Sequence, residues 1–74
     1  MSPNEFNDIF SYVLKNHHFC RLTNNSAEYH GKYKNKIVKI KMTDLGMNRY
    51  IYMNGCKYYT TYIGCEYAIG VRIL

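Results

Sequence analysis

Tyrosines and basic residues alternate in the C-terminal third of the chain, residues 49–74. Tyrosine and arginine are among the types most enriched where proteins bind one another, and aromatic rings beside lysines also suit unpaired bases and their phosphates. The stretch therefore favours the chemistry of a binding surface over that of a catalytic centre. The residues expected to form this docking patch are Tyr50, Tyr52, Lys57, Tyr59 and Arg72.

A second group of basic residues precedes the docking patch. Five lysines fall within residues 32–41. Such a run can neutralise several phosphates, and it is also typical of a solvated hairpin in which charge prevents an edge strand from mispairing. The members expected to share the solvent face form a secondary basic patch, which is a candidate extension of the docking patch and consists of His30, Lys32, Lys39 and Lys41.

Residues that hold metals or transfer protons are few and scattered. The cysteines and histidines match no zinc-binding spacing and contain no C-x-x-C pair. Of the five acidic residues, Glu5, Asp8 and Glu28 are expected to have local structural roles, and Asp44 and Glu66 have no paired carboxylate nearby in the sequence. We therefore expect no catalytic residue, no metal site and no cofactor. One enzymatic hypothesis remains, a small metal-independent ribonuclease in which His30 acts beside Lys32 and Lys39. The scattered residues are His17, His18, Cys20, His30, Cys56 and Cys65.

The docking patch depends on two predicted hairpins. Asn54 and Gly55 separate two β-rich runs, and Asn-Gly is a preferred pair for a type I′ turn because both residues must adopt positive φ. Gly64 and Cys65 are expected to form a second two-residue turn. The resulting pairs are Tyr50 with Tyr59, Tyr52 with Lys57, and Lys57 with Arg72. Because side chains alternate along a strand, the opposite face collects Ile51, Met53, Cys56, Tyr58, Thr60, Tyr62, Tyr67, Ile69, Val71 and Ile73.

Residues 27–42 predict another hairpin, with Lys34 and Asn35 as its turn. The even length of this loop keeps the apolar residues of both strands on one face. Further expectations are pairs of Tyr29 with Ile40, Gly31 with Val38, His30 with Lys39 and Glu28 with Lys41, a short strand at His17–Leu22, a turn at Thr23–Ser26, and a loop or single helical turn at Thr43–Asn48.

The N-terminal residues predict an amphipathic helix over Pro3–Lys15. Ser2 suits the N-cap, Pro3 the first helical position and Glu5 the third, while Asn16 suits the C′ position, the residue after the C-cap. Apolar residues recur at helical spacing and should pack on the apolar face of the sheet. They are Phe6, Ile9, Phe10, Val13 and Leu14.

Length and composition limit the architecture. The 74 residues predict one small α+β domain over residues 1–74, with the helix on one face of an antiparallel meander of five to six strands. The net charge of +5 favours an acidic partner. An odd cysteine count, no signal-peptide pattern and no apolar run of about 20 residues predict a cytoplasmic protein with no membrane partner.

Together these features predict a non-catalytic binding module. We expect it to dock its Tyr/Lys/Arg face on an acidic protein or nucleoprotein surface of a host and to obstruct it. A composition rich in Asn, Lys, Tyr and Ile, whose codons are AT-rich, favours a phage or mobile-element origin. The alternative is a single-stranded nucleic-acid-binding domain that uses the same face. The apolar segment Ala68–Leu74 also leaves open a homodimer through an edge strand.

Overall fold

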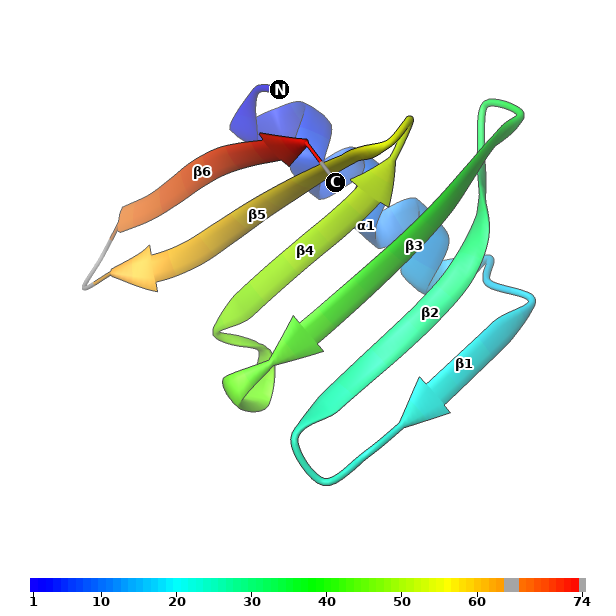
Figure 1. Ribbon diagram of the computed structural model, residues 1–74, viewed down its shortest axis with the longest axis horizontal. Helices are drawn as coiled ribbons and strands as arrows, with labels where there is room; N and C mark the ends of the chain where they lie inside the picture. The colour runs from blue at the N-terminus through cyan, green and yellow to red at the C-terminus, as the bar shows by residue number, and fades with distance from the viewer. Residues whose placement is uncertain (64–65, 74) are drawn as a thin grey trace.

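One α-helix lies across one face of a six-stranded antiparallel sheet in the computed structural model (Figure 1). The structure describes residues 1–63 and 66–73, and it describes the side chains of residues 1–60. The strands neighbour one another in sequence order from β1 to β6. This confirms the predicted α+β meander. The elements are α1 (Pro3–Lys15), β1 (Phe19–Leu22), β2 (Ser26–Tyr33), β3 (Lys36–Thr43), the 3-10 helix η1 (Asp44–Gly46), β4 (Asn48–Met53), β5 (Cys56–Ile63) and β6 (Glu66–Ile73).

Helix α1 has the predicted bounds. Its N-terminus is capped by the Ser2 hydroxyl, which accepts a hydrogen bond from the Glu5 backbone N–H at 3.1 Å. At the other end Asn16 is the C-cap, with a φ of −124°, and not the residue after the cap as expected. Both its backbone N–H and its side-chain amide donate to the Tyr12 carbonyl, at 2.9 and 3.0 Å.

The core forms where the apolar stripe of α1 meets β3 and β4. Phe6, Ile9, Phe10 and Val13 are buried against Val38, Ile40, Ile51 and Met53. Leu14 was expected in this stripe but is 38% exposed. Leu14 lies at the flank of the stripe, since the four buried residues already complete the i, i+3, i+4, i+7 pattern that faces the sheet.

The close contact of α1 with the sheet depends on Gly31 in β2. A Cβ atom at this position would lie 3.3 Å from the Asn16 carbonyl oxygen and 3.4 Å from a Val13 methyl carbon. A larger residue would therefore push the end of the helix away from the sheet. Strand β1 follows this end and begins at Phe19, two residues later than expected. Before it, the His17 imidazole Nδ1 lies 3.0 Å from the Leu14 carbonyl oxygen.

The predicted hairpin registers are confirmed. Lys34 and Asn35 have φ values of 49° and 66°, and Asn54 and Gly55 have values of 56° and 73°, as type I′ turns require. The predicted turn at residues 64–65 lies outside the described residues. The register of β5 with β6 is described, however, and it pairs Lys57 with Arg72 as expected.

The connection between β3 and β4 was predicted only as a loop or a helical turn. It is η1, in which Asp44, Leu45 and Gly46 all have positive φ, at 53°, 57° and 88°. The Asn48 side-chain amide donates to an Asp44 carboxylate oxygen at 2.6 Å and holds the turn closed. This connection fixes the register of β3 against β4, with Lys39 opposite Tyr52.

Candidate binding face

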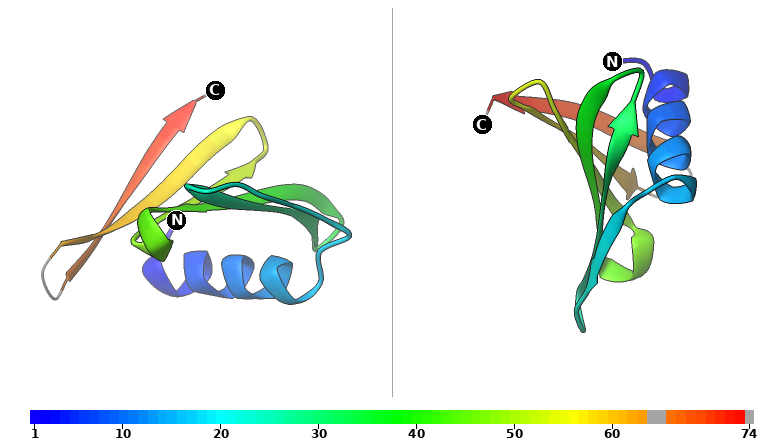
Figure 2. Two further views of the ribbon diagram at one scale, coloured as in Figure 1. Left: turned by 90° about the horizontal axis from the view of Figure 1, so that it is seen from below. Right: turned by 90° about the vertical axis from the view of Figure 1, so that its right-hand side faces the viewer.

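Helix α1 covers one face of the sheet, and no other element of residues 1–63 and 66–73 covers the opposite face, here called the open face (Figure 2). The strand registers place side chains of the open face in two neighbouring rows that cross all six strands. The first row runs through Phe19, His30, Lys39, Tyr52, Lys57 and the backbone position of Arg72. The second row runs through Arg21, Glu28, Lys41, Tyr50, Tyr59 and Gly70.

The open face is strongly basic. Within residues 1–60, whose side chains are described, Glu28 is the one acidic residue in the two rows. Basic residues from four strands outnumber it, including Lys32, which follows the first-row residue His30 by two positions on β2. This excess of positive charge attracts acidic groups and opposes the docking of another basic surface. The basic residues are Arg21, Lys32, Lys39, Lys41 and Lys57.

Tyrosine rings form the centre of the open face and lie beneath lysine ammonium groups. Tyr50 and Tyr52 have ring centroids 6.5 Å apart, and Tyr59 lies 6.5 Å from Tyr50. The Lys39 ammonium lies 4.3 Å from the centroid of Tyr52, and the Lys57 ammonium lies 4.7 Å from that of Tyr50. These are cation–π contacts. These contacts restrict the Lys39 and Lys57 ammonium groups to positions over the tyrosine rings.

The Tyr52 hydroxyl is protonated at neutral pH. Burial raises its pKa above the usual value of 10.0, and the neighbouring Tyr50 and Glu28 raise it further. A phenol that keeps its proton remains a hydrogen-bond donor. Beside the Lys39 ammonium it therefore gives the centre of the open face a second donor for an acidic group.

The His30 ring is held between an aromatic residue and a carboxylate. It packs edge-on against Phe19, with centroids 5.0 Å apart, and its Nε2 lies 3.9 Å from a Glu28 carboxylate oxygen. This nitrogen is enclosed by protein and has no hydrogen-bond partner among the described residues. In this arrangement His30 Nε2 is not accessible to a substrate.

The structure brings the two predicted patches together. Tyr50, Tyr52, Lys57 and Tyr59 lie side by side on β4 and β5, as the hairpin register predicted. Their neighbours on β3 are Lys41 and Lys39, which belong to the secondary basic patch predicted as a candidate extension of the docking patch. The backbone register places Arg72 opposite Lys57, and its side chain lies outside the described part.

Two residues of β1 extend the open face beyond the sequence prediction. Phe19 pairs with His30, and Arg21 pairs with Glu28. Both side chains are exposed. The predicted turn at Thr23–Ser26 could have indicated that these two residues belong to the open face, because a turn there places the preceding strand next to β2. The sequence pattern alone leaves the register of that pairing open.

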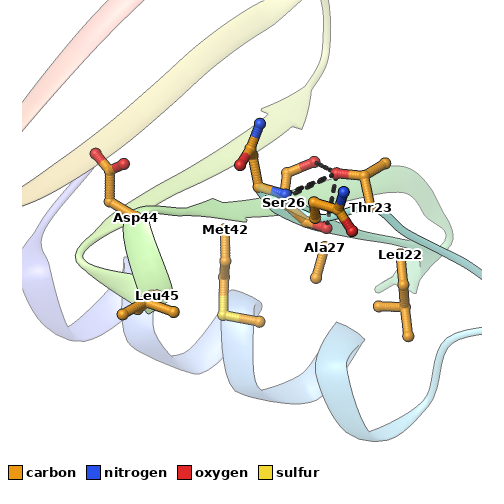
Figure 3. A pocket seen from close by; sticks show the side chains of 10 residues that line it. Leu22, Thr23, Ser26, Ala27, Met42, Asp44 and Leu45 are labelled. Atoms are coloured by element: carbon orange, nitrogen blue, oxygen red, sulfur yellow. Dashed lines mark hydrogen bonds between the residues drawn. The ribbon is translucent and has the colours of Figure 1, made fainter.

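A hollow of about 620 Å³ lies at the end of the sheet where the β1–β2 turn and η1 are found, between these two segments (Figure 3). Leu22, Ala27, Met42 and Leu45 supply its apolar lining, and the Thr23 and Ser26 hydroxyl oxygens at its rim lie 2.9 Å apart in a hydrogen bond. The described residues that line it include no histidine, cysteine or basic residue. Its chemistry is thus unlike that of the open face.

Candidate metal ligands do not come together in the described part of the chain. No group of three or more His, Cys, Asp or Glu side chains suited to a metal ion occurs there. Cys20 is exposed and Cys56 is half-buried, and both are free thiols. His17 packs edge-on against Tyr29, with centroids 4.9 Å apart, which gives it a structural role at the end of α1.

Comparisons with known proteins add no relative to this description. No protein-family model, no curated protein and no solved structure matches the chain. Over the described residues, the structure contains no helix with both the length and the apolar character that a membrane crossing requires. The functional proposal therefore rests on the physical properties of the open face.

Proposed function

We propose that this chain is a non-catalytic binding module that docks its open face on an acidic surface of a host protein or nucleoprotein complex and obstructs that surface. The observation that carries the proposal is the pair of ammonium groups, from Lys39 and Lys57, held over the rings of Tyr52 and Tyr50 in the centre of an uncovered face. Side chains already restricted in the free molecule lose less conformational entropy on binding.

The same contacts favour an acidic protein surface over unpaired bases. A base that stacks on an aromatic ring needs a free ring face. Here an ammonium group lies over one face of both Tyr50 and Tyr52, so a stacking base would have to displace it. A carboxylate can instead approach the ammonium groups directly and leave both contacts intact. Binding of single-stranded nucleic acid by the same face is the alternative.

The geometry of His30 supports a binding role over a ribonuclease. A general base must reach the proton that it removes. The Nε2 atom of His30 is enclosed, and a Glu28 carboxylate oxygen lies 3.9 Å from it. The setting of the proposal is the cytoplasm of a host that carries a phage or mobile element, as the abundance of Asn, Lys, Tyr and Ile suggests.

Charge reversal on the open face tests the proposal. Tagged protein should capture a defined partner from host lysate, and K39E/K57E should lose it, with binding weakened by about tenfold or more. The control K15E/K36E makes the same change in net charge on exposed lysines of α1 and the start of β3, and it should capture the partner normally. Tyr52→Ala and Tyr59→Ala should also weaken capture. Recovery of the same partner by K39E/K57E would contradict the proposal.

Filter binding with mixed single-stranded oligonucleotides distinguishes docking on an acidic protein surface from the alternative, binding of single-stranded nucleic acid. Binding to phosphates weakens steeply between about 50 and 200 mM salt because counterions are released. We expect little retention of oligonucleotides even at the lower salt concentration. Strong retention that K39E/K57E abolishes, and K15E/K36E does not, would favour the nucleic-acid alternative.

A further inference from the structure

Strand β6 forms one edge of the sheet and differs from the edge at the other side. Among the described residues, no strand pairs with the outer side of β6 (Figure 1). Alternate residues of an antiparallel strand direct their N–H and C=O groups to opposite sides. Half of the peptide groups of Glu66–Ile73 therefore point away from β5 with no described partner. Such an edge is a template for another strand.

The opposite edge is protected in a way that β6 is not. Strand β1 has only four residues, and short edge strands limit mispairing. Strand β6 has eight residues, without proline or lysine, the residues that most often guard an edge. The side chains of α1 that form the core pack on β3 and β4, and Figure 2 shows the helix beneath the middle of the sheet. Access to the edge of β6 is thus not blocked by the helix.

The sequence of β6 is complementary to itself in charge. Its only charged residues are Glu66 and Arg72, and Ile69 lies midway between them. If two copies of β6 run antiparallel about a two-fold axis at Ile69, Glu66 of each copy lies opposite Arg72 of the other. Tyr67 is then opposite Val71, and Ala68 is opposite Gly70. This register pairs every residue from 66 to 72 and places opposite charges at both ends.

We infer that the protein forms a two-fold homodimer in which β6 pairs antiparallel with β6 of a second copy, in the register centred on Ile69. The two six-stranded sheets become one continuous sheet. Because directly opposite residues of paired strands share a face, both helices lie on the same side of it. The two open faces then join into a single, wider basic surface.

A charge-swap experiment tests both the dimer and its register. Light scattering coupled to size exclusion, over about 1 to 500 μM protein, should show the parent chain as a dimer. E66R and R72E should each raise the dissociation constant by about tenfold or more, because each puts like charges at both ends of the strand pair. An equimolar mixture of the E66R and R72E chains should form a heterodimer, because one chain then presents two positive positions and the other two negative ones.

Matched controls separate pairing from overall charge and from folding. D8R and K15E make the same charge changes on exposed positions of α1 and should dimerise like the parent. The double variant E66R/R72E restores opposite charges at both ends and should recover the dimer, which excludes loss of folding as the cause of the single effects. A parent chain that is monomeric at every concentration would overturn the inference. So would a mixture that does not associate, or controls as disruptive as E66R.

Discussion

Two isoleucines on β3, only three residues apart, have opposite environments. Ile40 is 0% exposed in the core between α1 and β4, whereas Ile37 is 77% exposed. Ile40→Ala should lower the free energy of unfolding by about 3 kcal/mol, because it removes buried methyl groups and leaves a cavity. Ile37→Ala, the same chemical change on the same strand, should cost less than about 1 kcal/mol. Urea titration measures both values, and equal losses would contradict the assignment of the faces of β3.

The Tyr52 hydroxyl links stability to high pH. Burial, followed by Tyr50 and Glu28, raises its pKa above 10.0 in the folded state. The folded chain therefore keeps this proton at a pH at which the unfolded chain releases it. The stabilisation is fully present below pH 10.0 and is lost as the pH rises through the folded-state pKa. Burial, with Cys56 and Glu5 as smaller causes, raises the pKa of Tyr58 in the same direction.

We therefore expect the free energy of unfolding to decline above about pH 10, and to decline less steeply in Tyr52→Phe. Urea titrations at several pH values measure the slope. Tyr12→Phe, on the exposed side of α1, is the matched control and should follow the parent. If all three proteins gave the same slope, Tyr52 would not be the group responsible.

The two described hairpin turns have the same backbone geometry but different sequences. Lys34 and Asn35 adopt positive φ values that cost a lysine more than a glycine, whereas Asn54 and Gly55 suit a type I′ turn. Conversion of the first turn to Asn-Gly, with K34N/N35G, should raise the free energy of unfolding by about 1 kcal/mol. The reciprocal change N54K/G55N should lower it by a similar amount. If both variants changed stability in the same direction, side-chain contacts and not backbone preference would control these turns.

Turn chemistry also explains how much of the fold the sequence could predict. The pair Asn54 and Gly55 has one preferred turn type, and this fixed which residues of β4 and β5 share a face. Helix α1 could be predicted equally well from the sequence, because Ser2 marks its start and a four-residue apolar stripe marks its buried side. The prediction that Leu14 is buried with the stripe was wrong, because helical periodicity does not show how wide a contact surface the sheet provides.

The register of β3 against β4, which joins the two patches, could not be predicted, for a local reason. Asp44 and Leu45 adopt positive φ in η1, a conformation that is uncommon for residues other than glycine and that the sequence did not reveal at Leu45. This connection determines that Lys39 meets Tyr52 and Lys41 meets Tyr50. Without its geometry the sequence suggests that the secondary basic patch can extend the docking patch, but it does not show which residues of the two patches lie opposite one another.

At the scale of the whole molecule, charge is distributed unevenly between the two layers. The exposed side of α1 has two acidic residues, Glu5 and Asp8, and one basic residue, Lys15, at its last turn. Among residues 1–60, the open face has one acidic side chain, Glu28, and five basic side chains. Among residues 1–60, whose side chains are described, positive charge is therefore concentrated on the open face. A charged partner meets a directed field from the open face, so it can be oriented before contact.

This asymmetry predicts that equal losses of charge have unequal effects. Lys41→Gln removes one positive charge from the open face, and Lys15→Gln removes one from α1. On a cation exchanger near pH 7, a molecule binds through its most positive face, and exposed charges farther away than about 10 Å are screened. We expect Lys41→Gln to elute at clearly lower salt than the parent, and Lys15→Gln to elute close to it. Identical elution of the two variants would mean that net charge alone controls binding and that the open face does not act as a unit.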